Sequence, residues 1–209
     1  MDPRGVREAH EDLPADMAGA FTRTGRVAWD VETSGLDWRT DRLATCQLFA
    51  EGVGVVVISL GGERPTQLVA LLEDPRVEKV FHHAPFDLRF MMHAWQARPA
   101  SVRCTKVASK LLEPQAPNES HSLQRLCSRY LAVSLDKGPV RTSDWLAPTL
   151  TGEQLAYAAG DVLYLPALLS VLEGALVSAG RADLYDACCA FLPSRVTLEL
   201  GNYPDVFAY

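Results

Sequence analysis

The chain has 209 residues, of which 48% are hydrophobic and 22% are charged, and 20 Lys and Arg stand against 26 Asp and Glu, for a net charge of -6. This balance is typical of one well-packed soluble domain, and the acidic charge disfavours a protein that binds a long polyanion by counterion release. The five cysteines form no Cys-x-x-Cys pair, which disfavours a disulfide framework and a zinc site. No run of about 18 apolar residues occurs, which disfavours a signal peptide and a membrane span.

Residues 1–26 are weakly patterned, with a break at Leu13-Pro14 and a short strand predicted before it. A clear pattern begins after them, where three apolar residues run into Asp30-x-Glu32 and a Thr-Ser-Gly turn follows. Because alternate residues of a strand face the same side, Asp30 and Glu32 should lie together near the end of a buried strand. Two carboxylates there repel each other and need a cation, and their oxygen ligands suit Mg²⁺ or Mn²⁺ rather than zinc. The alternative, for an isolated Asp-x-Glu, is a strand that ends in a solvated acidic turn.

Two further strands, a helix and a fourth strand follow. Residues 43–49 and 53–58 are rich in apolar and β-branched residues, and the short Gly-containing link between them predicts a β-hairpin beside the first strand. An amphipathic helix around residues 68–72 ends at Asp74-Pro75. Residues 79–81 then predict a fourth strand after this crossover.

At residues 82–92 a strand gives way to a helix whose first turn contains Pro85 and Asp87. Asp87 either serves the same site as the earlier carboxylates or merely complements the helix dipole. His82 and His83 are adjacent, and neighbouring residues at a strand end point in opposite directions, so they should not bind one metal together. We predict His83 as a substrate contact and His82 as structural.

The middle of the chain alternates predicted helices with loops. Residues 102–112 predict a short strand or turn followed by a helix, and residues 113–119 form a loop with two prolines. Ser122 is a predicted cap for a helix over residues 123–131. Residues 136–145 are polar and basic for their length and form either a solvated linker or the best local anion-binding patch in an acidic chain, with Lys137, Arg141 and Ser143.

Thr151 and Gln154 have the form of a capping box at the start of another helix. Tyr157 and Asp161 are four residues apart in this helix, so a phenol and a carboxylate share one of its faces. Pro166 should kink the helix or begin a new one.

The end of the chain predicts a last helix over residues 181–192 and an extended aromatic tail with Tyr203, Phe207 and Tyr209. The tail either packs on its own domain or serves as an interface between protomers.

The motifs in combination resemble a known family. Asp30-x-Glu32, Asp87 after a strand and Tyr157-x-x-x-Asp161 form the three-motif pattern of the DEDD exonucleases, in the subclass with tyrosine. The ensemble resembles the ribonuclease D family from residue 27 to residue 172, because further segments agree in order and spacing: Leu135-Asp136-Lys137, Ser143-Asp144-Trp145, Leu150-Thr151 and Gln154-Leu155.

Three more selective segments resemble the short bacterial branch called nano-RNase C, whose members degrade very short RNA, notably dinucleotides, and assemble as ring-like octamers. These segments are Cys104–Leu111, Phe191–Arg195 and Asp205–Ala208. The chain departs from that branch at His121-Ser122-Leu123, where His-Gly-Leu is usual, and at residues 138–142, which replace a glutamine-rich stretch. It also ends before the position of the HRDC helical domains of long ribonuclease D.

The resemblance implies a ribonuclease H-like α/β fold, with a mixed central β-sheet flanked by helices and the 27–31 strand at its centre. It implies a single 3′-5′ exonuclease domain with three parts, an N-terminal segment 1–26, a catalytic core 27–178 and a C-terminal helix and tail 179–209. It also implies two divalent metal ions, Mg²⁺ or Mn²⁺, held by Asp30, Glu32, Asp87 and Asp161.

The implied reaction is hydrolysis of short single-stranded RNA, including dinucleotides, from the 3′ end to nucleoside 5′-monophosphates. Tyr157 would position or deprotonate the attacking water, and Leu36 would act as the family's apolar wedge between terminal bases unless it is a buried loop leucine. The expected substrate contacts are Thr33, Gly35, Leu36, His83, Lys137, Arg141 and Ser143. We expect a cytoplasmic homo-oligomer, an octamer by analogy with the branch, without a membrane partner.

Two other functions stay open on the sequence alone. One is a broader ribonuclease D-like exonuclease that acts on structured RNA or DNA, and the other is a catalytically inactive nucleic-acid-binding protein. The complete set of four carboxylates and a tyrosine disfavours the inactive protein. The broader exonuclease differs from the leading hypothesis in its preferred substrate length.

Overall fold

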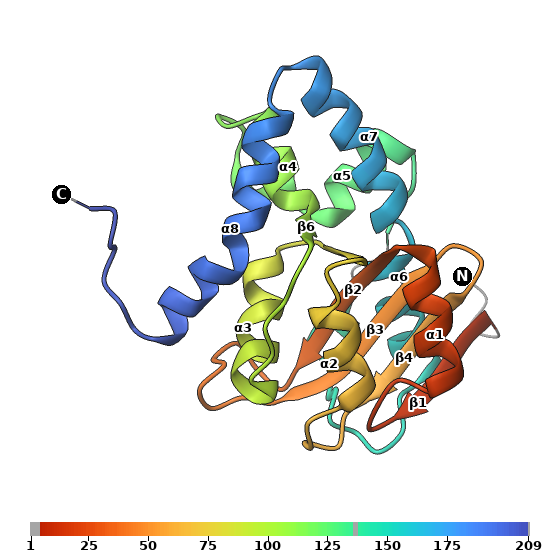
Figure 1. Cartoon of the computed structure of the whole chain (residues 1–209). Coiled ribbons are helices and arrows are strands. Elements are labelled where there is room, and N and C mark those ends of the chain that lie inside the picture. The colour runs from red at the N-terminus through yellow and green to blue at the C-terminus, as the bar shows by residue number, and fades with distance from the viewer. Residues whose placement is uncertain (1–4, 136–137, 209) are drawn as a thin grey trace.

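The protein is built on a mixed β-sheet of six strands within the described part of the chain (Figure 1). The computed structural model describes residues 5–135 and 138–208. The strand order is β1-β4-β3-β2-β5-β6. The strands are β1 Val6–His10, β2 Arg26–Thr33, β3 Leu43–Ala50, β4 Gly54–Ser59, β5 Glu78–Phe81 and β6 Val102–Cys104.

Strand β2 lies inside this sheet, between β3 and β5. The predicted hairpin of β3 and β4 is present, and β3 also pairs antiparallel with β2. After the crossover through α2, β5 pairs with β2 in parallel. Gly52 and Gly54 close the hairpin with φ angles of 77° and 95°, a region that strains residues with a Cβ. The predicted mixed sheet, with the 27–31 strand at its centre, is therefore confirmed.

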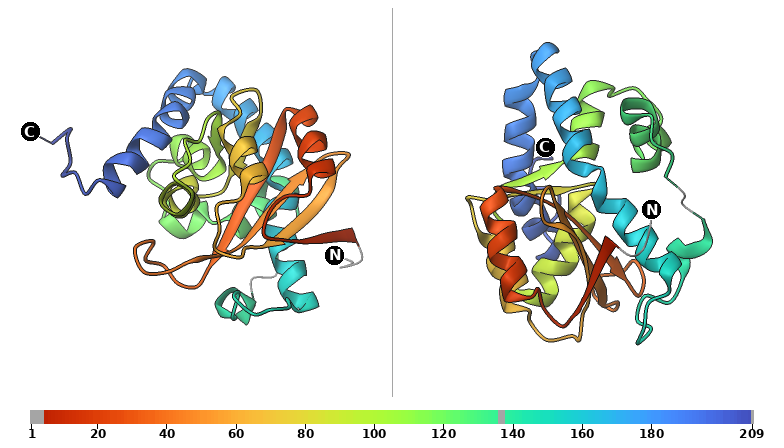
Figure 2. Two further views of the ribbon diagram at one scale, coloured as in Figure 1. Left: turned by 60° about the horizontal axis from the view of Figure 1, so that its bottom comes forward. Right: turned by 90° about the vertical axis from the view of Figure 1, so that its right-hand side faces the viewer.

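Helices cover both faces of the sheet, with α1, α2 and α3 on one side and α6 across the other (Figure 2). A second group, α4, α5, α7 and α8, packs together beyond one end of the strands (Figure 1). The helices are α1 Ala15–Thr24, α2 Thr66–Glu73, α3 Ala84–Trp95, α4 Thr105–Leu112, α5 Leu123–Leu131, α6 Gly152–Leu163, α7 Leu165–Ser178 and α8 Ala182–Leu200, with short 3-10 helices η2 Asn118–His121 and η3 Pro139–Thr142.

The burial of β2 changes along its length. Val27, Ala28 and Trp29 are fully buried, whereas Asp30 and Glu32 are only half-buried. The strand thus runs from the core to the surface, which allows carboxylates at its carboxyl end without full loss of hydration.

The N-terminal segment contains the predicted short strand, β1, but also a helix that the sequence analysis did not predict. Helix α1 buries Met17 and Phe21, which are four residues apart on one face. Two large apolar residues in one short helix give a weak periodic signal, which explains why the pattern was missed. The helix ends at Gly25, whose φ of 70° is the left-handed conformation of a C-terminal cap.

The last helix is longer than predicted. The sequence analysis ended it at Leu192, but α8 continues through Pro193 to Leu200. Proline removes one helical hydrogen bond, yet Val196 beyond it is fully buried, so packing holds the second part in place. The ribbon of α8 changes direction along its length, as expected for a helix that contains proline (Figure 1).

The two predicted helix caps have different outcomes. Thr151 Oγ1 accepts from the Gln154 N–H at 3.2 Å and Gln154 Oε1 accepts from the Thr151 N–H at 2.9 Å, so the capping box is confirmed. Ser122 is the N-cap residue of α5, as predicted, but its hydroxyl donates to the Glu119 carbonyl at 2.8 Å and makes no side-chain capping hydrogen bond. The Ser122 hydroxyl is hydrogen-bonded to the preceding 3-10 helix, η2, instead.

Pro166 begins a new helix and does not kink α6, because it lies in the first turn of α7. By length and composition alone, the stretch Gly152–Ser178, which joins α6 and α7, is long and apolar enough to cross a membrane. Half of the most apolar part of this stretch is buried against the rest of the protein. Core helices of folded domains can be equally long and apolar.

Candidate active site

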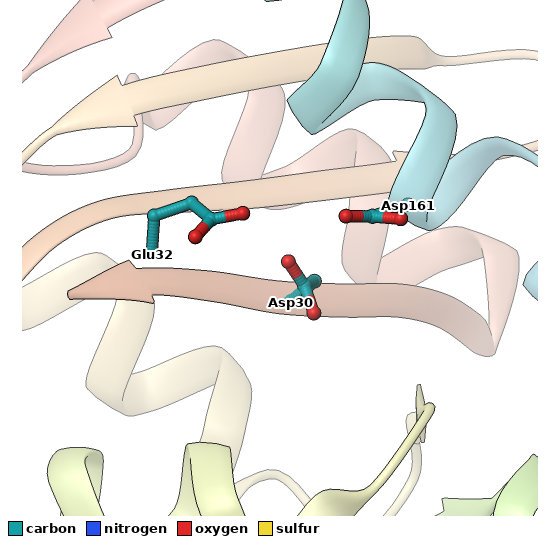
Figure 3. A group of neighbouring side chains, drawn as sticks. All are labelled: Asp30, Glu32 and Asp161. Carbon is teal, nitrogen blue, oxygen red and sulfur yellow. The ribbon is translucent and has the colours of Figure 1, made fainter. Parts of the chain in front are cut away.

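Three carboxylates meet at the carboxyl end of β2 (Figure 3). Asp30 and Glu32 come from β2 and Asp161 comes from α6, and one oxygen of each lies within 4.8 Å of the others. Asp161 is 6% exposed. Three negative charges so close in a partly buried site repel one another. The set is therefore chemically suited to a hard divalent cation such as Mg²⁺ or Mn²⁺.

Helix α6 carries both Tyr157 and Asp161 to this end of the sheet. Ala158 and Ala159 are fully buried, and their small side chains let the helix lie close to the strands. Tyr157 lies one turn before Asp161, and both line one cleft. Trp145 packs against Tyr157 with ring centroids 5.8 Å apart, which restricts the orientation of the phenol.

The fourth carboxylate, Asp87, comes from α3 and is 3% exposed. Its Oδ1 accepts from the Val31 backbone N–H at 3.2 Å. Strand β5 pairs with β2 only as far as Ala28, so this N–H lies beyond the paired region and bonds a side chain. Burial raises the pKa of Asp87 well above its usual range, and the negative charges of Asp30 and Glu32 raise it further. Asp87 therefore belongs to the carboxylate cluster and does more than complement a helix dipole.

These side chains line a cleft of about 510 Å³. Five of the predicted substrate contacts also line it: Thr33, Gly35, Leu36, His83 and Ser143. The sequence analysis missed several other lining residues, among them His82, Phe86, Thr142 and Trp145. Phe86 directly precedes Asp87, and Trp145 is two residues beyond Ser143. Aromatic rings next to predicted contacts are the signal that could have identified them, because nucleobases stack on such rings.

His82 and His83 both line the cleft, although only His83 was predicted as a substrate contact. His83 has a left-handed backbone, with φ 77° and ψ 43°, which interrupts the alternation of the strand just before α3. His82 Nδ1 also lies 2.8 Å from Thr105 Oγ1, so this ring is held by a structural contact as expected.

Leu36 follows β2 and is 83% exposed, which excludes the alternative of a buried loop leucine. Asp41 braces this turn, since its Oδ2 accepts from the Asp37 N–H at 2.9 Å and its Oδ1 accepts from Ser34 Oγ at 3.2 Å. A Cβ on Gly35 would overlap the Asp41 carboxylate, so a larger residue there would displace the side chain that holds this turn. Leu36 is therefore presented to the cleft by an ordered turn.

A group of cations that the sequence analysis did not predict lies around His83. We call it the His83 cation group, and it consists of Arg89, Lys106, Lys110 and Arg195. Partial burial of the imidazole and the positive charges of this group lower the pKa of His83 to about 4. His83 is therefore neutral at neutral pH. Arg89 and Arg195 each also pair with Glu199, at 3.5 and 3.1 Å, which offsets part of the positive charge of the group.

The predicted anion-binding patch is described only in part. Lys137 lies outside the described residues. Arg141 belongs to η3, next to Thr142 and Ser143, which line the cleft. Gln154 Nε2 donates to Ser143 Oγ at 3.0 Å, which ties this segment to the first turn of α6.

Sequence comparison agrees with this geometry, because the family model described as 3′-5′ exonuclease matches residues 9–176. The chain belongs to the 3′-5′ exonuclease family. Within it, the chain is similar to ribonuclease D of Haemophilus influenzae, with 34% identity over 148 residues, which are 70% of this chain and 36% of that protein. Ribonuclease D of Gluconacetobacter diazotrophicus is likewise longer, and the chain spans 47% of its length.

Solved structures give the same family and the predicted ribonuclease H-like fold. Brucella melitensis NrnC is 38% identical, with a TM-score of 0.90 over 99% of both chains. The same protein is known with bound Mg²⁺, at a TM-score of 0.88, 38% identity and 98% of both chains. It is also known bound to pGG, at a TM-score of 0.88, 39% identity and 98% of both chains. Escherichia coli RNase D is 25% identical, with a TM-score of 0.80 over 91% of this chain and 50% of that chain.

Proposed function

We propose that this member of the exonuclease family is a metal-dependent 3′-5′ exoribonuclease. It hydrolyses phosphodiester bonds of short RNA, including dinucleotides, and releases nucleoside 5′-monophosphates. The observation that carries this proposal is the convergence of Asp30, Glu32, Asp87, Asp161 and Tyr157 in one cleft. Four crowded carboxylates are unfavourable in a folded chain, and divalent cations that also bind a phosphodiester offset that cost.

Two divalent ions, when bound, would stabilise charge on the phosphoryl oxygens and lower the pKa of water. Asp30 would be shared by both ions, as the resemblance to the DEDD motif implies, and its carboxylate lies within 4.8 Å of Glu32 and Asp161. Glu32 and Asp161 would complete one site. Asp87 would face the other ion, mostly through water.

Tyr157 orients or deprotonates the attacking water in this proposal. Its place on the same helix face as Asp161 brings the phenol to the carboxylates, and Trp145 limits its motion. A phenol has an ordinary pKa of about 10, so Tyr157 would need a neighbouring cation to act as a base at neutral pH.

Three features support short substrates. A cleft of about 510 Å³ has the size of a small-molecule site. Leu36, Phe86 and Trp145 offer apolar and aromatic surfaces on which a few bases can stack. Lys106 and Lys110 of the His83 cation group add positive charge near His83, and a few such charges suit a short substrate better than one with many phosphates. The pGG complex of the Brucella protein is consistent with this preference.

We also propose that the protein is a homo-oligomer, with the octamer of the nano-RNase C branch as the expected state. Tyr203, Val206 and Phe207 are 61%, 51% and 74% exposed, and the tail extends away from the body of the protein (Figure 1). Phe207 contacts Phe191, with ring centroids 5.7 Å apart, so the tail touches its own chain at this ring. Exposed aromatic residues outside the core favour association. Light scattering should show an assembly several times the mass of one chain.

The test is a length profile on labelled RNA and matched DNA, using a dinucleotide, a heptamer and a twenty-mer with Mg²⁺ or Mn²⁺. The expected result is the highest kcat/KM on the RNA dinucleotide. Equal or better cleavage of the twenty-mer would favour the broader ribonuclease D-like exonuclease. Failure to hydrolyse any substrate with either ion would favour the inactive nucleic-acid-binding protein.

A further inference from the structure

Strand β3 places a polar pair directly opposite the carboxylates of β2. In the antiparallel register Gln47 pairs with Asp30, and Thr45 pairs with Glu32. Gln47 and Thr45 are fully buried. Their nearest neighbours on the strand, Cys46 and Leu48, are fully buried as well, so two polar side chains lie within an otherwise apolar strand.

The amide of Gln47 bonds the central carboxylate of the site. Gln47 Nε2 donates to Asp30 Oδ2 at 2.5 Å, and Thr45 Oγ1 donates to Gln47 Oε1 at 3.1 Å. An ionised carboxylate only accepts hydrogen bonds, so the amide nitrogen must face Asp30 and the amide oxygen must face Thr45. The carboxylate of Asp30 therefore determines the orientation of the amide, and the Thr45 hydroxyl donates to the amide oxygen that this orientation leaves.

A neutral hydrogen-bond donor beside a metal-binding carboxylate interferes less with metal binding than a cation would. Lys or Arg opposite Asp30 would neutralise the carboxylate and compete with a divalent ion. Gln47 restricts the rotation of Asp30 and leaves its full negative charge for the ion. Groups that hold a metal ligand in this way commonly change metal affinity when they are removed.

We propose that Gln47, held by Thr45, is a positioning residue that presents the Asp30 carboxylate to divalent metal. This inference rests on the metal-dependent function proposed above. It adds two residues of β3, outside the carboxylates and tyrosine of the motif, to the determinants of metal affinity.

The primary test is metal titration of chelator-treated protein by calorimetry, with Mg²⁺ and Mn²⁺ and without substrate. Gln47→Met removes the donor and keeps an unbranched side chain of similar length. We expect the dissociation constant to rise about ten- to hundredfold. The KM for dinucleotide at saturating metal should stay near the wild-type value. Thr45→Val should weaken metal binding in the same direction by a smaller factor.

Ser109→Ala is the matched control, because Ser109 is also buried and its hydroxyl lies 2.7 Å from His121 Nδ1, outside the cleft. It should lower the melting temperature and leave metal affinity unchanged. If Gln47→Met does not fold, the metal affinity of Thr45→Val tests the inference, because this variant keeps the Gln47 side chain and removes only the hydroxyl that donates to it.

Unchanged metal affinity in folded Gln47→Met, or in Thr45→Val where that variant decides, would overturn the inference alone. Wild-type protein that binds neither ion would overturn the proposed function together with it. The two failures are therefore distinguishable in one titration series.

Discussion

Strand β2 begins with Arg26, which pairs with carboxylates, and ends with Asp30 and Glu32, which face a third carboxylate. At the amino end, opposite charges alternate between neighbouring elements. At the carboxyl end, like charges gather around one point. Because both ends belong to the same strand, the difference in charge pattern reflects the different roles of the two clusters, structural at the amino end and ligand-binding at the carboxyl end.

The amino-end cluster joins the sheet to the C-terminal helices. Arg26 Nη2 lies 2.6 Å from Glu78 and 3.4 Å from Glu173 of α7. Glu78 also accepts from Arg103 Nε at 3.1 Å, and Arg103 reaches Asp186 of α8. Each of the inner charges has an opposite neighbour, so the network supports the fold without an added ligand.

The carboxyl-end cluster has the reverse property. Asp30, Glu32 and Asp161 have carboxylate oxygens within 4.8 Å of one another, and burial together with the charges of Asp30 and Glu32 raises the pKa of the neighbouring Asp87. Such an arrangement is retained where a bound cation and a reaction need it. Mutations should therefore affect activity at one end and stability at the other.

The largest expected effect is the loss of activity in Asp30→Asn. Loss of the shared anion should lower the turnover rate by at least about 10⁴-fold, because metal stabilisation of the transition state is worth several kcal/mol. The metal-free melting temperature should not fall, since the substitution removes a repelling charge. Turnover with Mn²⁺ and melting in chelator measure the two quantities, and substantial residual turnover would contradict the role of Asp30.

Tyr157→Phe should follow, with a fall in kcat of about 10²- to 10⁴-fold, the contribution of a general acid or base. The KM should change little because the ring still packs against Trp145. Steady-state kinetics with a dinucleotide check this. A loss of less than about tenfold would mean that the phenol has only a structural role.

The third effect is on stability and depends on pH. Burial raises the folded-state pKa of Asp87 above its unfolded value, so the contribution of this group to stability is fully present below the unfolded pKa and is lost as the pH rises through the folded value. In chelator, Asp87→Asn should exceed the wild type in unfolding free energy by about 1–3 kcal/mol at neutral pH, because the Val31 N–H only partly compensates the buried charge of Asp87. The advantage should shrink as the pH falls towards about 4, the ordinary pKa of an aspartate.

Denaturant unfolding of both proteins across this pH range measures the difference. Saturating Mg²⁺ should reverse the order at neutral pH, because the ion needs the ionised Asp87. An advantage of Asp87→Asn that does not vary with pH would contradict this explanation.

The smallest effect is expected at the amino end of β2. Glu78→Gln should lower the unfolding free energy by about 1 kcal/mol, because the partly exposed charges of Arg26 and Arg103 lose a shared partner. High salt should reduce the loss by screening, and kcat/KM should not change. Asp16→Asn is the control, since it breaks a more exposed pair with Arg7 and should leave the unfolding free energy unchanged. A large loss of activity in Glu78→Gln would show that the two ends of β2 are not separable.

Local pattern was sufficient for much of the fold and for the central part of the site. Strand alternation placed Asp30 and Glu32 together, and helical spacing placed Tyr157 and Asp161 on one face. The hairpin, the capping box and the bounds of α5 were predicted for the same reason, because they depend on residues a few positions apart. The helix α1 was missed where that local signal was weak.

The sequence by itself therefore determined the candidate site residues of β2 and α6, their local geometry and the family. Tertiary structure decided how distant segments complete the site. The Asp87–Val31 and Gln47–Asp30 hydrogen bonds join residues 56 and 17 positions apart. The His83 cation group comes from three helices. The exposure of Leu36 and the continuation of α8 through Pro193 likewise depend on what packs beside them. Contacts of this kind leave no periodic signal, because their energy comes from surfaces that meet only after the chain has folded.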